Sequence, residues 1–333
     1  MIKWLRGGRW SGLIAAQRRV ALLIVAAAAP GVFAQEWPTG TVRVVVPYGP
    51  GSTPDIVARV VSDRLSAKLG KPFFVDNKPG AGGMLGTDAV AKAAPDGQTI
   101  GISIAGPLAV NTLLYRKMPY DPADLAPVTI AATQASVVVA SPSLNVGTAS
   151  ELVTLLKANP GKYNYSSMGA GSISHLAMEA LAARSGAQMV HVPYAGSGPA
   201  VAALLAGDTH VAALPAAAVM SHIKAGKLKA IAVATEKRSP ALPELPTLRE
   251  AGIENVFADA WMGFVVPART PDALVARVYD EISKVLAEPE VREKLRAQYM
   301  DVVANTPAEF RAAMKADVER WKPVIEKNSI KLD

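Results

Sequence analysis

Residues 47–55 read Pro-Tyr-Gly-Pro-Gly-Ser-Thr-Pro-Asp, and this stretch decides the fold of the chain around it. An apolar run, 42–46, comes before it, and an amphipathic run, 56–69, comes after it. This order predicts a strand, a loop rich in glycine and proline, and a helix. Such a loop presents bare backbone N–H groups beside a helix N-terminus, so it can hold an anion without an arginine.

The side chains of this loop favour the same interpretation. Ser52 or Thr53 can cap the helix, and Asp55 falls in its first turn, where the helix dipole favours a carboxylate. Tyr48 and Gly51 complete the candidate residues of the loop. A purely structural, capped turn is the alternative, but this loop is longer than a median connection.

Two later segments have the same character. Residues 165–175 follow a predicted strand and open a helix, and their candidate ligand-binding residues are Ser166, Ser167, Gly171, Ser172 and His175. Residues 192–200 repeat the pattern with Tyr194, Gly196 and Ser197. His175 also has a structural explanation, as a side chain that caps or packs. Since the carboxyl ends of parallel strands share one sheet edge, the three loops can face one crevice. A fourth glycine-rich loop, 77–83, either helps to bind or only allows close helix–strand packing, and we favour packing.

Strand-like and helix-like patterns alternate along nearly the whole chain. The pattern predicts an α/β protein in which each of two lobes is a mostly parallel sheet flanked by helices. A polar break at 133–136 and a segment rich in Pro and Glu at 235–262 predict two strands that cross between the lobes. One lobe then comprises 35–134 with 260–333, and the other comprises 135–259. A cleft between two such lobes is a natural small-molecule site.

The first 34 residues have the three parts of an export signal. Five basic residues without an acidic one are followed by an apolar run, 20–29, and by small residues up to Ala34. The apolar run is shorter than the roughly 20 residues that span a bilayer. We therefore predict a signal peptide, 1–34, that is cleaved near Ala34, and an N-terminal buried helix is the alternative.

Charge and cysteine content limit the possible functions further. The whole chain has a formal charge of +7, and five of these charges lie in the first 34 residues, so the remainder carries about +2. This argues against a nucleic-acid or membrane-surface partner. The chain has no cysteine, so the exported part must be stable on core packing alone.

No pattern in the sequence is typical of a catalytic or metal site. The four histidines lack metal-ligand spacing, and no Gly-x-Ser-x-Gly pentapeptide occurs. We expect no catalytic residue, no metal and no cofactor. A secreted α/β hydrolase that uses Ser172 or Ser197 is the enzymatic alternative.

Many short motifs occur in a fixed order along the exported part of the chain. In the first part they are Val-Val-Val-Pro-Tyr-Gly-Pro-Gly at 44–51 with Asp55, Asp-Asn-Lys-Pro-Gly-Ala-Gly-Gly at 76–83, Ala-Pro-Asp-Gly-Gln-Thr at 94–99 and Asn-Pro-Gly-Lys at 159–162. In the second part they are Gly171-Ser172 with His175-Leu176, His-Val-Pro-Tyr at 191–194, Gly-Pro-Ala at 198–200, Ile-Lys-Ala-Gly-Lys-Leu at 223–228, Lys-Arg-Ser-Pro at 237–240, Pro-Glu-Leu-Pro-Thr at 243–247, and Trp261 followed by Gly263. With these motifs the chain resembles the substrate-binding proteins of tripartite tricarboxylate transporters, the Bug or TctC-like family.

The resemblance implies a type II periplasmic binding protein, a Venus flytrap that closes on its ligand. It implies that a small carboxylate, such as a di- or tricarboxylate, is held through backbone amides, hydroxyls and ordered waters. The site residues that it implies are Tyr48, Gly51, Ser52, Asp55, Ser166, Ser167, Gly171, Ser172, Tyr194 and Gly196. It further implies a periplasmic monomer that delivers ligand to a permease of one large and one small subunit, and sensing through a membrane receptor is the alternative.

Two departures from the family pattern concern the identity of the ligand. Ser52 stands where relatives often have a second glycine, and Thr53-Pro54 is a less usual continuation. His210 stands where an acidic residue is common. We expect both to affect which ligand is bound, not its class.

Overall fold

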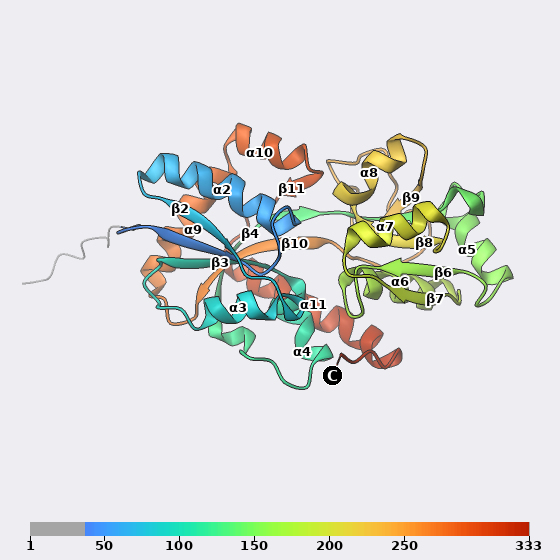
Figure 1. Ribbon diagram of the computed structural model, residues 1–333, viewed down its shortest axis with the longest axis horizontal. Coiled ribbons are helices and arrows are strands. Elements are labelled where there is room, and N and C mark those ends of the chain that lie inside the picture. Colours follow the sequence, from blue (N-terminus) through green and yellow to red (C-terminus); the bar gives the residue numbers. More distant parts are fainter. Residues whose placement is uncertain (1–36, 333) are drawn as a thin grey trace, which may run out of the picture. The chain divides into compact units, whose positions relative to one another are not determined.

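The computed structural model describes residues 37–332, which form one unit of alternating strands and helices (Figure 1). The predicted signal peptide, 1–34, lies outside the described residues. No helix within 37–332 is both long and apolar enough to cross a membrane.

Two sheets organise this unit. The six strands of the first sheet are β1 (Val42–Val46), β2 (Phe73–Asn77), β3 (Thr99–Ile104), β4 (Leu125–Gln134), β10 (Ala260–Pro267) and β11 (Met300–Val302). They lie in the order β11-β4-β10-β3-β1-β2. The five strands of the second sheet are β5 (Ser136–Ala140), β6 (Asn164–Ser167), β7 (Val190–Pro193), β8 (Val211–Pro215) and β9 (Lys229–Val233). Their order is β7-β6-β8-β5-β9. We call the parts of the unit that carry these sheets the first half and the second half.

Both sheets are mixed, which corrects the expectation of mostly parallel sheets. β1 pairs in parallel with β2 and β3, and β6 pairs in parallel with β7 and β8. The strands next to the two crossings run antiparallel to their neighbours: β10 to β3 and β4, and β5 to β8 and β9. The path of the chain explains these antiparallel pairs. The chain passes from the first sheet to the second through β4 and β5, and it returns through β9 and β10. The predicted ligand loops all follow strands of the parallel parts.

Ten helices pack around the two sheets in the described part of the chain. They are α2 (Thr53–Leu69), α3 (Met84–Ala91), α4 (Asn111–Leu114), α5 (Ala149–Ala158), α6 (Ile173–Ser185), α7 (Ser197–Ala206), α8 (Ala216–Lys224), α9 (Asp272–Leu286), α10 (Pro289–Arg296) and α11 (Pro307–Lys327). Figure 1 shows α2 and α3 on opposite sides of the first sheet.

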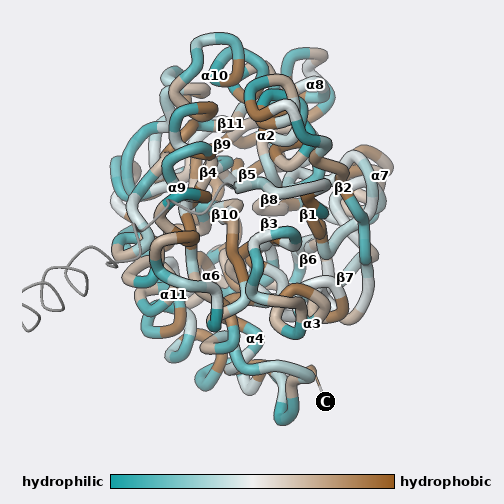
Figure 2. Tube along the Cα trace, turned by 90° about the vertical axis from the view of Figure 1, so that its left-hand side faces the viewer, coloured by the Kyte–Doolittle hydropathy of each residue, from teal (hydrophilic) through white to brown (hydrophobic). Residues whose placement is uncertain are grey.

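This covering by helices explains the continuous apolar sequence of β1. Val44 and Val46 belong to the hydrophobic cluster that includes α2 and α9, whereas Val45 belongs to the cluster that includes Met84 and Val90 of α3. Side chains alternate between the faces of a strand, so a strand covered on both faces needs an apolar residue at every position. Figure 2 shows hydrophobic stretches gathered in the strands and hydrophilic stretches in outer helices such as α10.

Helix α11 anchors β10, the strand by which the chain returns to the first sheet. The Trp261 Nε1–H group donates to Asp317 Oδ2 at 2.6 Å, and the Trp261 ring meets the Phe310 ring edge to face at 5.2 Å between centroids. A Cβ atom on Gly263 would collide with the Phe310 ring, so the glycine is what lets α11 approach β10 so closely.

The strand predicted at 42–46 forms as β1 with the same bounds, and the helix predicted from the run 56–69 forms as α2, which begins three residues earlier at Thr53. The main omission is the segment 105–114, for which no element was predicted. It forms a π-helical turn, Gly106–Val110, followed by α4. Its residues are apolar almost throughout, so they have neither the period of a strand nor that of an amphipathic helix.

Candidate functional site

The three predicted loops lie at the carboxyl ends of parallel strands. The first loop (residues 47–52) leads from β1 to α2, the second loop (168–172) from β6 to α6, and the third loop (194–196) from β7 to α7. In Figure 1 the carboxyl ends of β1 and β6 point toward the neighbouring sheet. The first loop and the other two therefore lie on the sides by which the two halves face each other.

Asp55 holds the first loop together from inside. The residue is only 2% exposed. Its Oδ2 atom accepts the Gly51 N–H group at 2.8 Å and Arg59 Nε at 3.0 Å, and its Oδ1 atom accepts Asn77 Nδ2 at 2.9 Å. The same Asn77 Nδ2 donates to the Tyr48 carbonyl at 2.8 Å. The carboxylate therefore fixes the path of the loop, and the Gly51 N–H group is used within the protein.

These contacts keep Asp55 ionised. Burial alone would raise the pKa of its carboxyl group, but hydrogen bonds from Arg59, Gly51 and Asn77, with the charge of Arg59, lower the pKa below its ordinary value. A negative charge is thus fixed in the first turn of α2, where the helix dipole favours it.

Within residues 37–332, Ser52 places a buried, unpaired hydroxyl group at the same helix end. It occupies the N-cap position of α2 but makes no side-chain capping bond, and its buried Oγ atom has no partner among the described residues. Thr53 donates instead to Gln134 Oε1, at a long 3.4 Å. At the first loop, the Ser52 hydroxyl is therefore left without a partner among the described residues, whereas the Gly51 N–H group and the Thr53 hydroxyl are bonded within the protein.

Backbone contacts join the second and third loops into one surface. The Tyr194 N–H group donates to the Ser167 carbonyl at 3.0 Å, and a Cβ atom on Gly169 would lie 3.6 Å from the Tyr194 carbonyl. Ser172 caps α6 by accepting the His175 N–H group at 3.3 Å, and its own hydroxyl donates to the Gly169 carbonyl at 2.7 Å.

The N-terminus of α7 completes this surface. Gly196 is its N-cap residue with a φ of 115°, a backbone conformation that glycine adopts and other residues rarely do. Among the described residues, no heavy atom beyond its chain neighbours lies within 4 Å of the Cβ position of Gly196, so this side of the glycine is open. Ser197 begins the helix, and the fully buried Ser166 supports it from beneath by donating to the Ala200 carbonyl at 3.2 Å.

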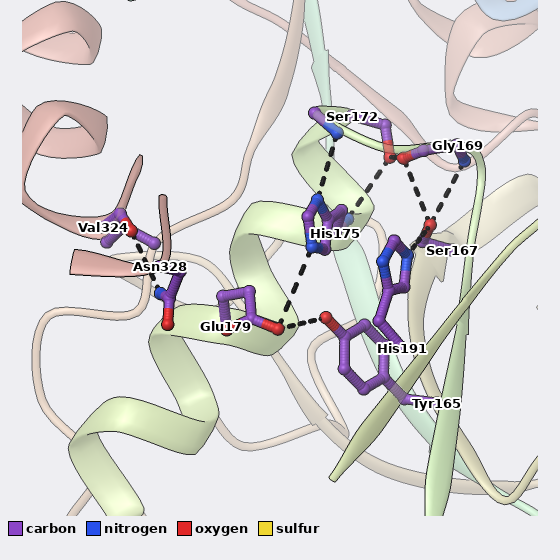
Figure 3. A network of polar contacts seen from close by, with 10 residues as sticks. Tyr165, Ser167, Gly169, Ser172, His175, Glu179, His191, Val324 and Asn328 are labelled. Carbon is purple, nitrogen blue, oxygen red and sulfur yellow. Dashed lines mark hydrogen bonds and ion pairs between the residues drawn. The ribbon is translucent and has the colours of Figure 1, made fainter. Parts of the chain in front are cut away.

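Three stacked rings support the second loop from beneath (Figure 3). The centroids of His175 and His191 are 3.9 Å apart, and those of His191 and Tyr165 are 4.9 Å apart. His175 Nδ1 accepts the Gly171 N–H group at 3.0 Å, and His191 Nε2 lies 2.7 Å from Ser167 Oγ. The ring stack (Tyr165, His191 and His175) therefore positions both ends of the loop.

Burial makes this ring stack neutral. It lowers the pKa of His175 to about 4, and it also lowers that of His191 to about 4, where the neighbouring His175 adds to the effect. Both imidazoles are then uncharged near pH 7, as the acceptor role of His175 Nδ1 requires. At the edge of the stack, the Tyr165 hydroxyl donates to Glu179.

The contact between Ser167 and His191 is not a catalytic dyad. Such a pair needs a nucleophile that substrate can reach, whereas Ser167 is fully buried and its Oγ atom also accepts the Gly169 N–H group at 3.2 Å. Within residues 37–332, no three His, Asp or Glu side chains gather as metal ligands would.

The structure divides the predicted site residues into two groups. At the facing surfaces, partly or fully exposed, are Tyr48, Gly51, Ser52, Thr53, Gly171, Ser172, Tyr194, Gly196 and Ser197. Buried behind these surfaces are Asp55, Ser166, Ser167 and His175. The first group remains predicted to touch ligand, and the second group supports the loops.

Sequence reasoning missed two supporting residues, Asn77 and His191. Both stand inside matched motifs, at 76–83 and 191–194, so the signal for them was present. His210, noted above as a departure from the family pattern, hydrogen-bonds with Asn164 Oδ1 at 2.7 Å through its Nδ1 atom, at the opposite end of β6 from the second loop. It therefore lies away from the loops.

A family model and curated relatives match most of this chain. Residues 57–330 match the model of the tripartite tricarboxylate transporter family receptor, TctC. Protein BugT of Bordetella pertussis is 35% identical over 307 residues, which cover 92% of this chain and 94% of BugT.

Solved structures give the same result. One structure of an R. palustris protein with adipate is 32% identical with a TM-score of 0.79, and the match covers 87% of this chain and 98% of that chain. MatC from Rhodopseudomonas palustris, with bound malate, is 29% identical with a TM-score of 0.75, and the match covers 87% and 100% of the two chains. The chain therefore belongs to the tripartite tricarboxylate transporter receptor family, the TctC or Bug family of periplasmic solute-binding proteins, which are not enzymes.

Proposed function

We propose that this protein captures a small organic carboxylate between its two halves and delivers it to a tripartite tricarboxylate-type permease of one large and one small subunit. Export through residues 1–34, with cleavage near Ala34, brings it to the periplasm. The observation that carries the proposal is the arrangement of three glycine- and serine-bearing helix N-termini, of α2, α6 and α7, at the facing sides of the two halves.

The ends of α6 and α7 suit a carboxylate because helix N-termini offer hydrogen-bond donors and favourable dipoles. At the end of α2, Arg59 balances the charge of Asp55. A hydrogen bond to a charged group contributes about 1.5–3 kcal/mol net, so three or four of them support micromolar binding at roughly 8 kcal/mol. Donors from both halves must act together, so a bound ligand favours a closed arrangement of the halves.

The solved relatives favour the same class of ligand. An R. palustris protein holds adipate and MatC holds malate, and both are carboxylates. A screen by thermal shift and calorimetry with adipate, malate, citrate, amino acids and sugars tests the proposal directly. Failure of every carboxylate to bind would contradict it.

A variant at Ser197 tests whether the end of α7 meets the negative charge. Ser197→Asp places a carboxylate in the first turn of α7, which is expected to stabilise that helix by about 0.3–1 kcal/mol. The same charge repels an anionic ligand, so we expect carboxylate affinity to fall about tenfold or more while the melting temperature holds or rises. Ser197→Asn, similar in shape without the charge, should lose much less affinity. Equal affinities of the two variants would show that this helix end does not meet the ligand.

A further inference from the structure

The C-terminal tail, residues 328–332, turns back from the end of α11. Ser329 has a positive φ of 50°. The Ile330 N–H group donates to the Ile325 carbonyl at 3.0 Å, and the Ser329 N–H group donates to the Glu326 carbonyl at 3.2 Å. These two bonds form a Schellman motif, in which one residue of left-handed conformation changes the direction of the chain at a helix end. Ile325 and Ile330 are both buried in the same hydrophobic cluster, so the direction of the tail is fixed.

The tail is bonded to α4. The Leu332 N–H group donates to the carbonyl of Leu114, the last residue of α4, at 3.1 Å. Leu114 is buried, and Leu332 packs partly buried against the hydrophobic cluster that contains Leu114. Figure 1 shows the C-terminal end of the chain beside α4. Two segments of the first half that lie far apart in the sequence therefore place two leucine side chains at one point.

These two leucines close on Gly171 of the second loop. A Cβ atom on Gly171 would lie 2.8 Å from Leu114 Cδ1 and 2.8 Å from Leu332 Cδ1. Carbon atoms in ordinary contact are about 3.5–4.0 Å apart, so only a glycine lets both leucines approach the backbone this closely. The leucines belong to the first half and Gly171 to the second, so this contact joins the two halves.

The second loop needs such support because of its glycines. Gly169 and Gly171 have positive φ values of 126° and 73°. A segment with two glycines loses more conformational entropy on ordering than one of larger residues does. Within its own half, the Gly171 N–H group is held by His175 Nδ1 at 3.0 Å. The leucines hold the same residue from the first half, so Gly171 is fixed by a hydrogen bond and by an apolar contact.

The position of Gly171 determines the position of a helix end that is proposed to meet the ligand. Ser172 comes next and is the N-cap residue of α6, and its N–H group donates to the Gly169 carbonyl at 3.2 Å. A site whose donors are already in place loses less free energy on binding than a site that must first be ordered. Movement of Gly171 would therefore weaken binding even though the leucines do not touch the ligand.

We propose that Leu332 is a positioning residue of the carboxylate site and that, together with Leu114, it holds the second loop in place at Gly171. The inference rests on the proposed function, because the second loop is one of the surfaces proposed to meet the ligand. It goes beyond that function, because it gives the C-terminal tail a part in ligand binding and makes one ligand loop depend on contacts from the opposite half.

Variants at Leu332 separate the contact with Gly171 from general packing. Leu332→Ala removes the atoms that approach Gly171, whereas Leu332→Met keeps an apolar side chain of similar volume. Leu113→Ala is the matched control, because Leu113 is also a partly buried leucine packed against the same hydrophobic cluster. We expect Leu332→Ala and Leu113→Ala to lower the melting temperature by similar amounts, so a loss of stability alone cannot explain a difference between them.

Hydrogen exchange of backbone amides reports on the second loop without any ligand. We expect Leu332→Ala to speed exchange in residues 168–172 by about tenfold or more and to leave the first loop, 47–52, as in the wild type. Leu332→Met and Leu113→Ala should exchange as the wild type does in both loops. Unchanged exchange of the second loop in Leu332→Ala, or an equal increase in Leu113→Ala, would overturn the inference.

Calorimetry with adipate, malate and citrate measures the effect on binding. For whichever of these acids the wild type binds most tightly, we expect Leu332→Ala to weaken affinity by about 5- to 20-fold, and Leu332→Met and Leu113→Ala to weaken it by less than about twofold. If Leu332→Ala bound this acid as tightly as the wild type does, the inference would be wrong and the proposed function would stand. A wild type that bound none of the three acids would contradict the proposed function and the inference with it.

Discussion

Asp55 shows that one side chain can fix the path of a whole loop in this site. Its carboxylate receives hydrogen bonds from a loop amide, from a neighbouring guanidinium group and from Asn77 at the end of β2. Its position in the first turn of a helix is readable from the sequence. Its partnership with Asn77 is not, because the two residues meet only through the register of β1 and β2, in which Val46 pairs with Asn77.

Replacement of this carboxylate should loosen the first loop. We expect Asp55→Asn to lower the free energy of unfolding by about 1–3 kcal/mol, because Gly51 and Arg59 lose a charged acceptor. The pKa of Asp55 is lowered in the folded protein, so its stabilising contribution is present above its ordinary pKa and is lost as the pH falls through the lowered value. Urea unfolding at pH 7 measures the difference. Asp63→Asn, at an exposed position of the same helix, should cost less than about 0.5 kcal/mol, and equal losses would show that Asp55 has no special role.

Asn111 illustrates the opposite limit of sequence reasoning. The residue lies in a nearly continuous apolar segment, 105–114, where no period indicates which side chains are buried. Its Nδ2 atom is buried without a hydrogen-bond partner among the described residues, and this is a property of the folded chain.

At the scale of elements, the site depends on helices that begin where parallel strands end. Glycine, proline and serine between an apolar run and an amphipathic run are enough to predict α2, α6 and α7 from the sequence. The stack under the second loop was not predictable in the same way. Tyr165 and His191 are brought together by the parallel pairing of β6 and β7, in which they are partners, and His175 comes from a helix.

This ring stack should make stability depend on pH. The pKa values of His175 and His191 are lowered to about 4 from an ordinary 6.5, so the folded protein favours the neutral rings. Their stabilising contribution is complete above pH 6.5 and declines as the pH falls toward 4, because the unfolded chain takes up protons first. For His175 alone we expect a loss of about 2 kcal/mol in unfolding free energy between pH 7.5 and pH 5.

Urea unfolding at these two pH values checks this expectation. The double variant His175→Gln/His191→Gln should be less stable at pH 7.5 and should lose less stability than the wild type on acidification. His222→Gln, on α8 and outside the stack, should keep the pH dependence of the wild type. If the double variant also kept the pH dependence of the wild type, the ring stack would not be the group that titrates.

At the scale of the whole molecule, the sequence indicated two sheets joined by two crossings, and the chain does leave the first sheet at Gln134 and return at Ala260. The proposed lobes, 35–134 with 260–333 and 135–259, follow these crossings. What the sequence could not show is that the crossings are bonded to each other. The Ser136 hydroxyl donates to the Ala258 carbonyl at 2.7 Å, and the Ala234 N–H group donates to the Ser136 carbonyl at 2.8 Å. Contacts between segments so far apart along the chain leave no pattern in the sequence around either residue.

Trp261 stands directly after this bonded region, so it should report closure of the halves. Its Nε1–H group is held by Asp317 of α11, and bending of the crossing next to it would change this environment. We expect a bound carboxylate to change the tryptophan emission of the wild type and to leave that of Trp261→Phe unchanged. Trp37→Phe is the matched control, because Trp37 packs on Phe73 and donates to the Gly97 carbonyl elsewhere in the first half, so it should keep the ligand response. A response that survives in Trp261→Phe and disappears in Trp37→Phe would place the moving region away from the crossings.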